Sequence, residues 1–175
     1  DLAQLYQDAA GPLVHDVWSA RDAYIPVILD RGPQAWAAFE QAHAARPLDD
    51  AEQVGLRKLL EMQRNALLMF TSCGWFFDDI SGIEATQVLL YAGRAAELAN
   101  EIDGGRRDLA LLRRLAEAPS NDPDFETGSL VFRNALVDAR VNAERALAHR
   151  LVARMLDHDA PDDFHTFGIN LDGVD

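Results

Sequence analysis

Cysteine is almost absent from this chain of 175 residues, because Cys73 is its only thiol. A single cysteine excludes an internal disulfide framework and a cysteine-rich zinc site. We therefore expect a reducing compartment, the cytoplasm. Cys73 also has no histidine close to it in the sequence, so we expect a small packed residue rather than a catalytic nucleophile.

Positive charge is scarce as well, with 16 Lys and Arg against 29 Asp and Glu, which gives a net charge of −13. Nucleic acids and anionic membranes attract concentrated Lys and Arg, so we expect neither as a partner. No apolar run approaches the roughly 20 residues that a membrane-spanning helix needs. The first residue is Asp1 rather than Met, and we expect a piece of a longer chain or a processed product.

The usual signatures of metal and cofactor sites are also missing. Glu40 and His43 have the Glu-x-x-His spacing of di-iron bundles, but such bundles need a second pair, which the sequence lacks. Gly104 and Gly105 follow a helical pattern instead of opening a helix after a strand, so they do not predict a phosphate-binding loop. We expect no metal, no cofactor and no catalytic residue in this chain.

Helical periodicity, punctuated by glycine and proline, organises most of the chain. Asp49 with Glu52, and Ser81 with Glu84, have the spacing of capping boxes, and Gly104 is typical of a helix C-terminus. The sequence predicts an all-α fold, an antiparallel helical bundle of about five to seven helices, over residues 1–160. A tail of coil or short strand follows over residues 161–175. The expected helices span residues 2–22 with a break at Gly11 and Pro12, then 34–45, 49–70, 81–102, 106–118 and 129–157, while residues 24–29 are ambiguous between helix and extended chain.

Residues 71–84, called the central segment below, interrupt this periodicity. Trp75, Phe76 and Phe77 stand together there and are followed by Asp78 and Asp79. Three adjacent aromatic residues cannot all face one core, so at least one should lie near a surface or cleft. Rings beside carboxylates suit a sugar or another polyhydroxylated ligand, because a ring stacks on the apolar face of a sugar and carboxylates accept its hydroxyl protons. Alternatively, the aromatic residues plug the bundle end and one aspartate caps the next helix.

Two polar clusters lie close to this segment in the sequence. Glu84, Gln87, Tyr91 and Arg94 recur at helical spacing, and they form either a second wall of the same cleft or a solvated face. Residues 21–24 could also line the cleft, but we expect them to form a salt-bridged helix end.

The run of residues 60–84 closely resembles a helical domain of unknown function, number 3536, of bacterial proteins related to glycoside hydrolase family 57. The similarity continues over residues 87–95 and touches residues 18–24 and 29–31. The resemblance implies that an N-terminal barrel with two catalytic carboxylates precedes this domain. It further implies action on α-glucans by a retaining mechanism, as in amylases, branching enzymes or glucanotransferases. Residues 72–79 resemble the Ser-Asp-Trp-like stretch that covers the barrel mouth, with Gly74 in place of the aspartate.

On this resemblance, the chain is a non-catalytic C-terminal helical domain whose partners are the barrel of the same parent chain and an α-glucan. Trp75 would stack on sugar and Phe77 would also contact it, while Asp78, Asp79 and Glu84 would orient its hydroxyl groups. A retaining glycosidase needs two carboxyl groups about 5 Å apart on opposite faces of the sugar, and adjacent aspartates are poorly placed for that. The alternative is a structural or interaction module that packs on the barrel or on a partner subunit without sugar contact. A third possibility is an independent helical-bundle enzyme.

Overall fold

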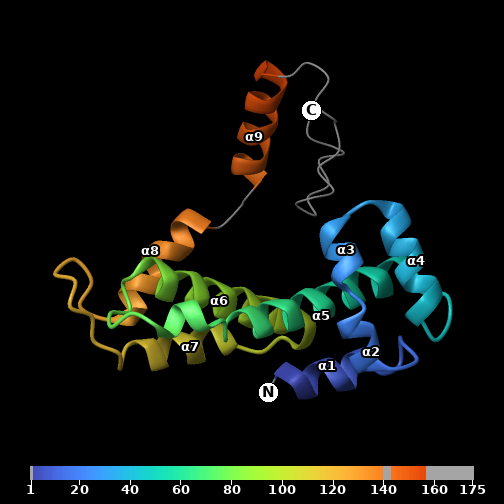
Figure 1. Ribbon diagram of the computed structural model, residues 1–175, viewed down its shortest axis with the longest axis horizontal. Helices are drawn as coiled ribbons and strands as arrows, with labels where there is room; N and C mark the ends of the chain where they lie inside the picture. Colours follow the sequence, from blue (N-terminus) through green and yellow to red (C-terminus); the bar gives the residue numbers. More distant parts are fainter. Residues whose placement is uncertain (1, 140–142, 157–175) are drawn as a thin grey trace. The chain divides into compact units, whose positions relative to one another are not determined.

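The computed structural model describes residues 2–139 and 143–156 of the chain (Figure 1). These residues contain the α-helices α1 to α9, one 3-10 helix and no strand, which confirms the all-α fold. The chain divides into two compact units, residues 1–138 and 139–175, and the site described below lies in the first. The tail expected over residues 161–175 lies outside the described residues.

The first part of the chain folds into short helices whose ends follow local signals. The predicted break at Gly11 and Pro12 is confirmed, and the next helix begins only at Val17. Asp16 caps the second helix by accepting a hydrogen bond from the Ser19 backbone N–H at 2.6 Å. The ambiguous stretch is helical over residues 25–29 with Tyr24 as the N-cap residue, and Pro26 lies in the first turn, where its missing N–H has no helical partner to lose. The helices are α1 (Leu2–Ala10), α2 (Val17–Asp22), α3 (Ile25–Leu29) and α4 (Pro33–His43).

Two long helices, α5 (Asp50–Leu68) and α6 (Ile83–Asp103), are the central helices of the first unit (Figure 1). The predicted capping box of α5 is confirmed, since Glu52 N donates to Asp49 Oδ1 at 2.9 Å and Asp49 N donates to Glu52 Oε2 at 3.1 Å. An ion pair of 2.8 Å joins Lys58 of α5 to Glu101 near the end of α6. The central segment connects the other ends of the two helices, so they run antiparallel.

The predicted capping box of α6 is wrong. Helix α6 begins at Ile83 with Gly82 as its N-cap residue, and Ser81 donates its backbone N–H to Asp79 Oδ1 at 2.8 Å. At its other end Gly104 takes the left-handed conformation, with φ of 72°, which confirms the predicted glycine cap. The remaining helices are α7 (Arg107–Leu115), α8 (Gly128–Ala139) and α9 (Ala143–Leu156), and residues 140–142 of the expected helix 129–157 lie outside the described residues.

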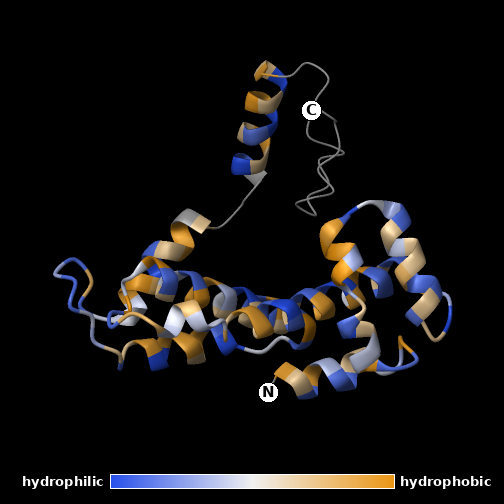
Figure 2. Ribbon diagram, viewed as in Figure 1, coloured by the Kyte–Doolittle hydropathy of each residue, from blue (hydrophilic) through white to orange (hydrophobic). Residues whose placement is uncertain are grey.

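The core of the first unit is built from α5 together with buried residues of α1 to α4 and α6. Its largest fully buried side chains include Tyr6, Leu56, Leu60, Met62 and Leu98. Figure 2 shows apolar and polar residues interspersed along α5 and α6, as expected for helices that pack on one side and meet water on the other. No helix in the described part of the chain is long and apolar enough to cross a membrane.

Candidate functional site

The central segment leaves α5 through a short 3-10 helix, η1 (Ser72–Trp75), that lies directly on α6. Thr71 begins it, with its hydroxyl donating to the Leu68 carbonyl at 2.8 Å. A Cβ atom built on Gly74 would lie only 2.5 Å from Val88 Cγ1 in the second turn of α6. Only glycine permits this approach. The aspartate expected at this position from the resemblance would not fit unless Val88 moved.

The three aromatic residues of the central segment all face solvent. Trp75 is 69% exposed, Phe76 is 82% exposed and Phe77 is 56% exposed. The rings of Phe76 and Phe77 meet edge to face with 5.4 Å between centroids, an arrangement that aromatic pairs favour. The prediction that at least one of these residues lies near a surface is confirmed. The alternative that they plug the end of the helical core is wrong.

The adjacent aspartates Asp78 and Asp79 have different surroundings. Asp79 Oδ1 accepts hydrogen bonds from the Ser81 N–H at 2.8 Å and the Ser120 hydroxyl at 2.9 Å, and Oδ2 accepts one from the Asn121 N–H at 2.6 Å. Hydrogen bonds from Ser81, then from Asn121 and Ser120, hold the pKa of Asp79 well below its usual range. Asp78 is exposed, and its carboxylate makes no hydrogen bond or ion pair with the described residues. Asp79 therefore belongs to the framework of the segment, while Asp78 is open to a ligand.

Two of the three donors to Asp79, Ser120 and Asn121, lie in the connection between α7 and α8, which we call loop 119–127. This loop closes on itself through an isolated antiparallel bridge between Pro119 and Thr127. Gly128 follows it, and a Cβ atom there would lie 2.6 Å from Cδ1 of Ile80 in the central segment. Residues more than 40 positions apart in the sequence thus hold the loop and the central segment together. Sequence reasoning missed Ser120 and Asn121, because no spacing pattern links them to Asp79.

Glu84 lies half-buried in the first turn of α6, where the helix dipole favours a negative charge. The polar stripe that begins with it does not continue as one wall of a site. Arg94, at its far end, forms an ion pair of 2.7 Å with Glu97 and lies 4.0 Å from Glu101. The arginine is therefore engaged in ion pairs toward the C-terminal half of α6. Trp75, Phe77, Asp78 and Glu84 remain the predicted contacts with a ligand.

Comparison with known proteins gives one family. A family model described as Domain of unknown function (DUF3536) matches residues 1–172. The chain belongs to the DUF3536 family. No curated protein and no solved structure matches it.

The only thiol of this DUF3536 domain is exposed. Cys73 was expected to be a small packed residue, and that prediction is wrong. The backbone turn of η1, fixed by Gly74 against α6, directs the Cys73 side chain outward, with Sγ 3.6 Å from the Thr71 hydroxyl. In the described ranges, 2–139 and 143–156, no group of three or more His, Cys, Asp and Glu residues could hold a metal ion.

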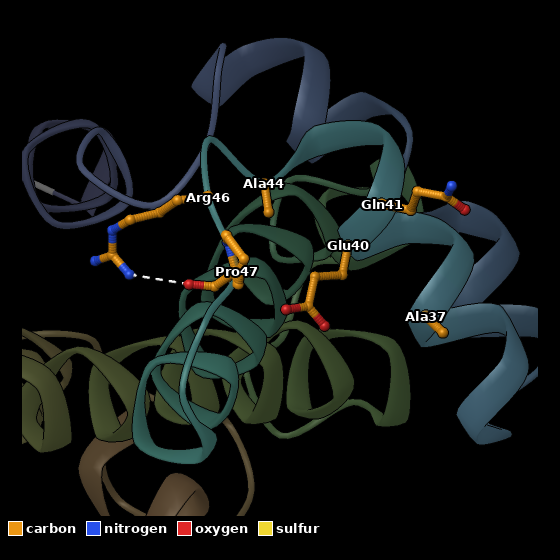
Figure 3. Close-up of a pocket in the computed structure, with 6 residues that line it drawn as sticks. All are labelled: Ala37, Glu40, Gln41, Ala44, Arg46 and Pro47. Carbon is orange, nitrogen blue, oxygen red and sulfur yellow. Dashed lines mark hydrogen bonds between the residues drawn. The ribbon is translucent and has the colours of Figure 1, made fainter.

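A hollow of about 410 Å³ lies between α4 and the turn that leads into α5 (Figure 3). Its charged groups are already engaged by the protein. Arg46 makes two hydrogen bonds to Glu52, of 2.7 and 2.6 Å, and a third of 3.2 Å to the Pro47 carbonyl. Glu40 Oε1 accepts the Leu48 N–H at 3.3 Å. These groups hold the turn, and we do not assign a ligand to this hollow.

The cluster around Glu61 of α5 is structural in the DUF3536 domain. Its carboxylate accepts hydrogen bonds from the Tyr24 hydroxyl at 2.9 Å, from Arg31 at 2.5 Å and from Arg64 at 3.1 Å. Burial raises the pKa of the Tyr24 hydroxyl, and the Glu61 charge raises it further. Tyr24 is buried in the core and Arg21 pairs with Asp22 at 2.7 Å, which confirms the structural role predicted for residues 21–24.

Proposed function

We propose that this DUF3536 domain is the non-catalytic C-terminal helical module of a glycoside hydrolase family 57-like protein that acts on α-glucans. In this proposal the central segment forms part of the rim of a substrate cleft on an N-terminal catalytic barrel of the same parent chain. The supporting observation is the exposure of Trp75, Phe76 and Phe77 on a segment that Gly74 and Asp79 hold in place. A cytoplasmic location fits the exposed, unpaired Cys73 thiol.

The proposed role of each side chain follows from its exposed ring surface or from its hydrogen-bonding atoms that have no partner in the protein. Trp75 offers an exposed ring on which the apolar face of a glucosyl unit can stack, and Phe77 extends that surface. Asp78 has both carboxylate oxygens free to accept hydroxyl protons. Glu84 would supply further acceptors at the start of α6. Asp79 already accepts three hydrogen bonds of the roughly four that a carboxylate can accept, so it contributes to the site chiefly by holding it.

Catalysis is assigned to the barrel rather than to these residues. A retaining mechanism needs a nucleophile and an acid that face each other across the scissile bond. Asp79 cannot serve as the acid, because its hydrogen bonds keep it ionised. Asp78 alone cannot supply the pair. The 175-residue chain should therefore neither hydrolyse nor transfer α-glucan, and turnover by the purified chain would contradict this division of labour.

The proposal is tested by Trp75→Ala in the intact protein, with turnover of a soluble α-glucan as the measurement. Loss of the stacking ring should lower kcat/KM about tenfold, which corresponds to about 1.4 kcal/mol of transition-state binding. Leu29→Ala is the control, because Leu29 is also a large exposed apolar side chain and lies on α3, away from the central segment (Figure 1). Equal kinetics for Trp75→Ala and the unaltered protein would remove Trp75 from the substrate site.

A second candidate function is a module that packs on the barrel or a partner subunit without sugar contact. It is favoured by further exposed apolar side chains that flank the aromatic residues, namely Leu67, Phe70 and Ile83. Such surfaces commonly mark protein contacts. In that case Trp75→Ala should lower the melting temperature or the oligomeric state of the intact protein, while the affinity for α-glucan stays unchanged.

A further inference from the structure

We infer that loop 119–127 forms a second wall of the candidate site and that Asp79 is the positioning residue that holds it there. The inference rests on the proposed function and names residues that neither the sequence pattern nor the resemblance indicated. Asn121 is the residue of the loop that we assign to the ligand.

The first step is the attachment of the loop. Ser120 and Asn121 donate to different oxygens of the Asp79 carboxylate, at 2.9 and 2.6 Å. The Ser120 hydroxyl also accepts the Asp122 N–H at 3.1 Å, which extends the same network along the loop. Displacing the loop would leave the Asp79 carboxylate without two of its three donors. Because both hydrogen bonds are made to a charged acceptor and are therefore strong, they favour the position in which the loop is attached to the central segment.

The second step is a close apolar contact beside these hydrogen bonds. Ile80, the residue after Asp79, packs against the backbone of Gly128, where the loop enters α8. The backbone of the loop is also closed by the Gly128 N–H, which donates to the Ala118 carbonyl at 2.9 Å. The loop is therefore anchored at its N-terminal side by Asp79 and at its C-terminal side by Ile80.

The third step is the chemistry that the loop adds. Asn121 is exposed, and its side-chain amide makes no hydrogen bond within the part of the chain that the structure describes. Asp78 offers only acceptors, whereas the Asn121 amide offers two N–H donors and one acceptor. Sugar hydroxyl groups both donate and accept, so a carboxylate and an amide together match them better than either alone. Asp78 precedes Asp79 in the chain, and the Asn121 backbone N–H donates to Asp79, so both residues adjoin the same carboxylate.

The experiment is calorimetric titration of the intact protein with maltoheptaose, together with amide hydrogen exchange of residues 71–84 and 119–127. Asn121→Ala should weaken maltoheptaose binding about fivefold without changing hydrogen exchange, because it removes ligand contacts and leaves the attachment intact. Asn134→Ala is the matched control, since Asn134 is an exposed asparagine on α8 outside the loop. It should bind as the unaltered protein does.

Asp79→Asn should weaken binding by a similar factor and also speed hydrogen exchange in both segments, which a residue that only contacts the ligand would not do. Ser120→Ala removes one hydrogen bond to Asp79 and should give a smaller change of the same kind, so the positioning role stays testable if Asp79→Asn does not fold. Faster exchange with unchanged affinity would overturn the positioning role. If Asn121→Ala binds maltoheptaose normally while Trp75→Ala binds it more weakly, the inference that loop 119–127 forms a second wall is overturned and the proposed function is not. Absence of maltoheptaose binding by the unaltered protein would overturn the proposed function and this inference together.

Discussion

Two glycines in the long helices provide a matched test of how closely α6 packs on α8. Gly55 lies inside α5, and a Cβ atom added there would meet no heavy atom within 4 Å. Gly93 lies inside α6, and its Cβ atom would lie 2.6 Å from Cζ and 2.8 Å from Cε2 of Phe132. Phe132 of α8 is almost fully buried, so its ring cannot move into solvent to relieve the contact. The same substitution should therefore have different effects at the two positions.

The magnitudes follow from two opposing contributions. Replacing glycine by alanine in a helix interior stabilises the folded state by about 1 kcal/mol, because the unfolded chain loses backbone freedom. That contribution is common to Gly55→Ala and Gly93→Ala. Only Gly93→Ala also overpacks the core, at a cost of about 1–3 kcal/mol. Gly55→Ala should raise the free energy of unfolding by about 1 kcal/mol, and Gly93→Ala should fall about 1–3 kcal/mol below it.

Urea unfolding followed by circular dichroism at 222 nm measures both variants, and their midpoints are compared at equal slope. Phe132→Leu in the Gly93→Ala background shortens the opposing side chain. The double variant should then be more stable than the sum of the two single changes predicts. If Gly93→Ala stabilises the chain as much as Gly55→Ala does, or if Phe132→Leu shows no coupling, the packing of α6 on α8 differs from the structure.

Three further outcomes are expected. Asp49→Ala removes the confirmed capping box of α5 and should lower the free energy of unfolding by about 1 kcal/mol in the same urea assay; an unchanged midpoint would contradict the role of the cap. The hydrogen bond from Arg46, followed by that from the Asp49 backbone, lowers the pKa of Glu52 from 4.5 to about 2. Because the folded state favours the ionised form, the stability from Glu52 is present above pH 4.5 and is lost as the pH falls toward 2. The stability difference between the unaltered protein and Glu52→Gln should therefore shrink over that range, and a constant difference would exclude this linkage. The exposed Cys73 should react with Ellman's reagent in the native protein, and reaction only after denaturation would show that the thiol is packed.

Helix boundaries set by neighbouring residues were predictable from the sequence. The Asp49 and Glu52 box and the Gly104 cap each depend on backbone groups within one helical turn. Ser81 and Glu84 have the same spacing, yet they form no box, because Asp79 binds the Ser81 N–H and Gly82 takes the N-cap position. Local spacing shows which hydrogen bonds are possible, whereas a competing acceptor determines which one forms.

The aromatic cluster was recognisable as a surface feature, because three adjacent rings cannot share one core. The exposure of all three, and of Cys73 before them, depends on the direction in which η1 leaves α5. That direction is set by the contact of Gly74 with Val88, which lies 14 residues ahead in the sequence. Sequence reasoning treated Gly74 as a departure from a resembling motif. In the structure it is the residue that allows the segment to lie on α6.

The pair Asp78 and Asp79 shows most clearly where sequence reasoning stops. As neighbours in one sequence they have the same chemistry, and both were assigned to the ligand. Ser120 and Asn121, more than 40 residues ahead, bind Asp79 and leave Asp78 free. Aromatic residues beside acids thus indicate a candidate site. The pattern does not show which of the acids contacts a ligand and which one holds the backbone in place. Gly74 and Gly128 are a further clue, because a Cβ atom at either position would lie within 2.6 Å of a side chain from another part of the chain. A glycine next to such a cluster is therefore a reason to look for a distant segment that completes the site.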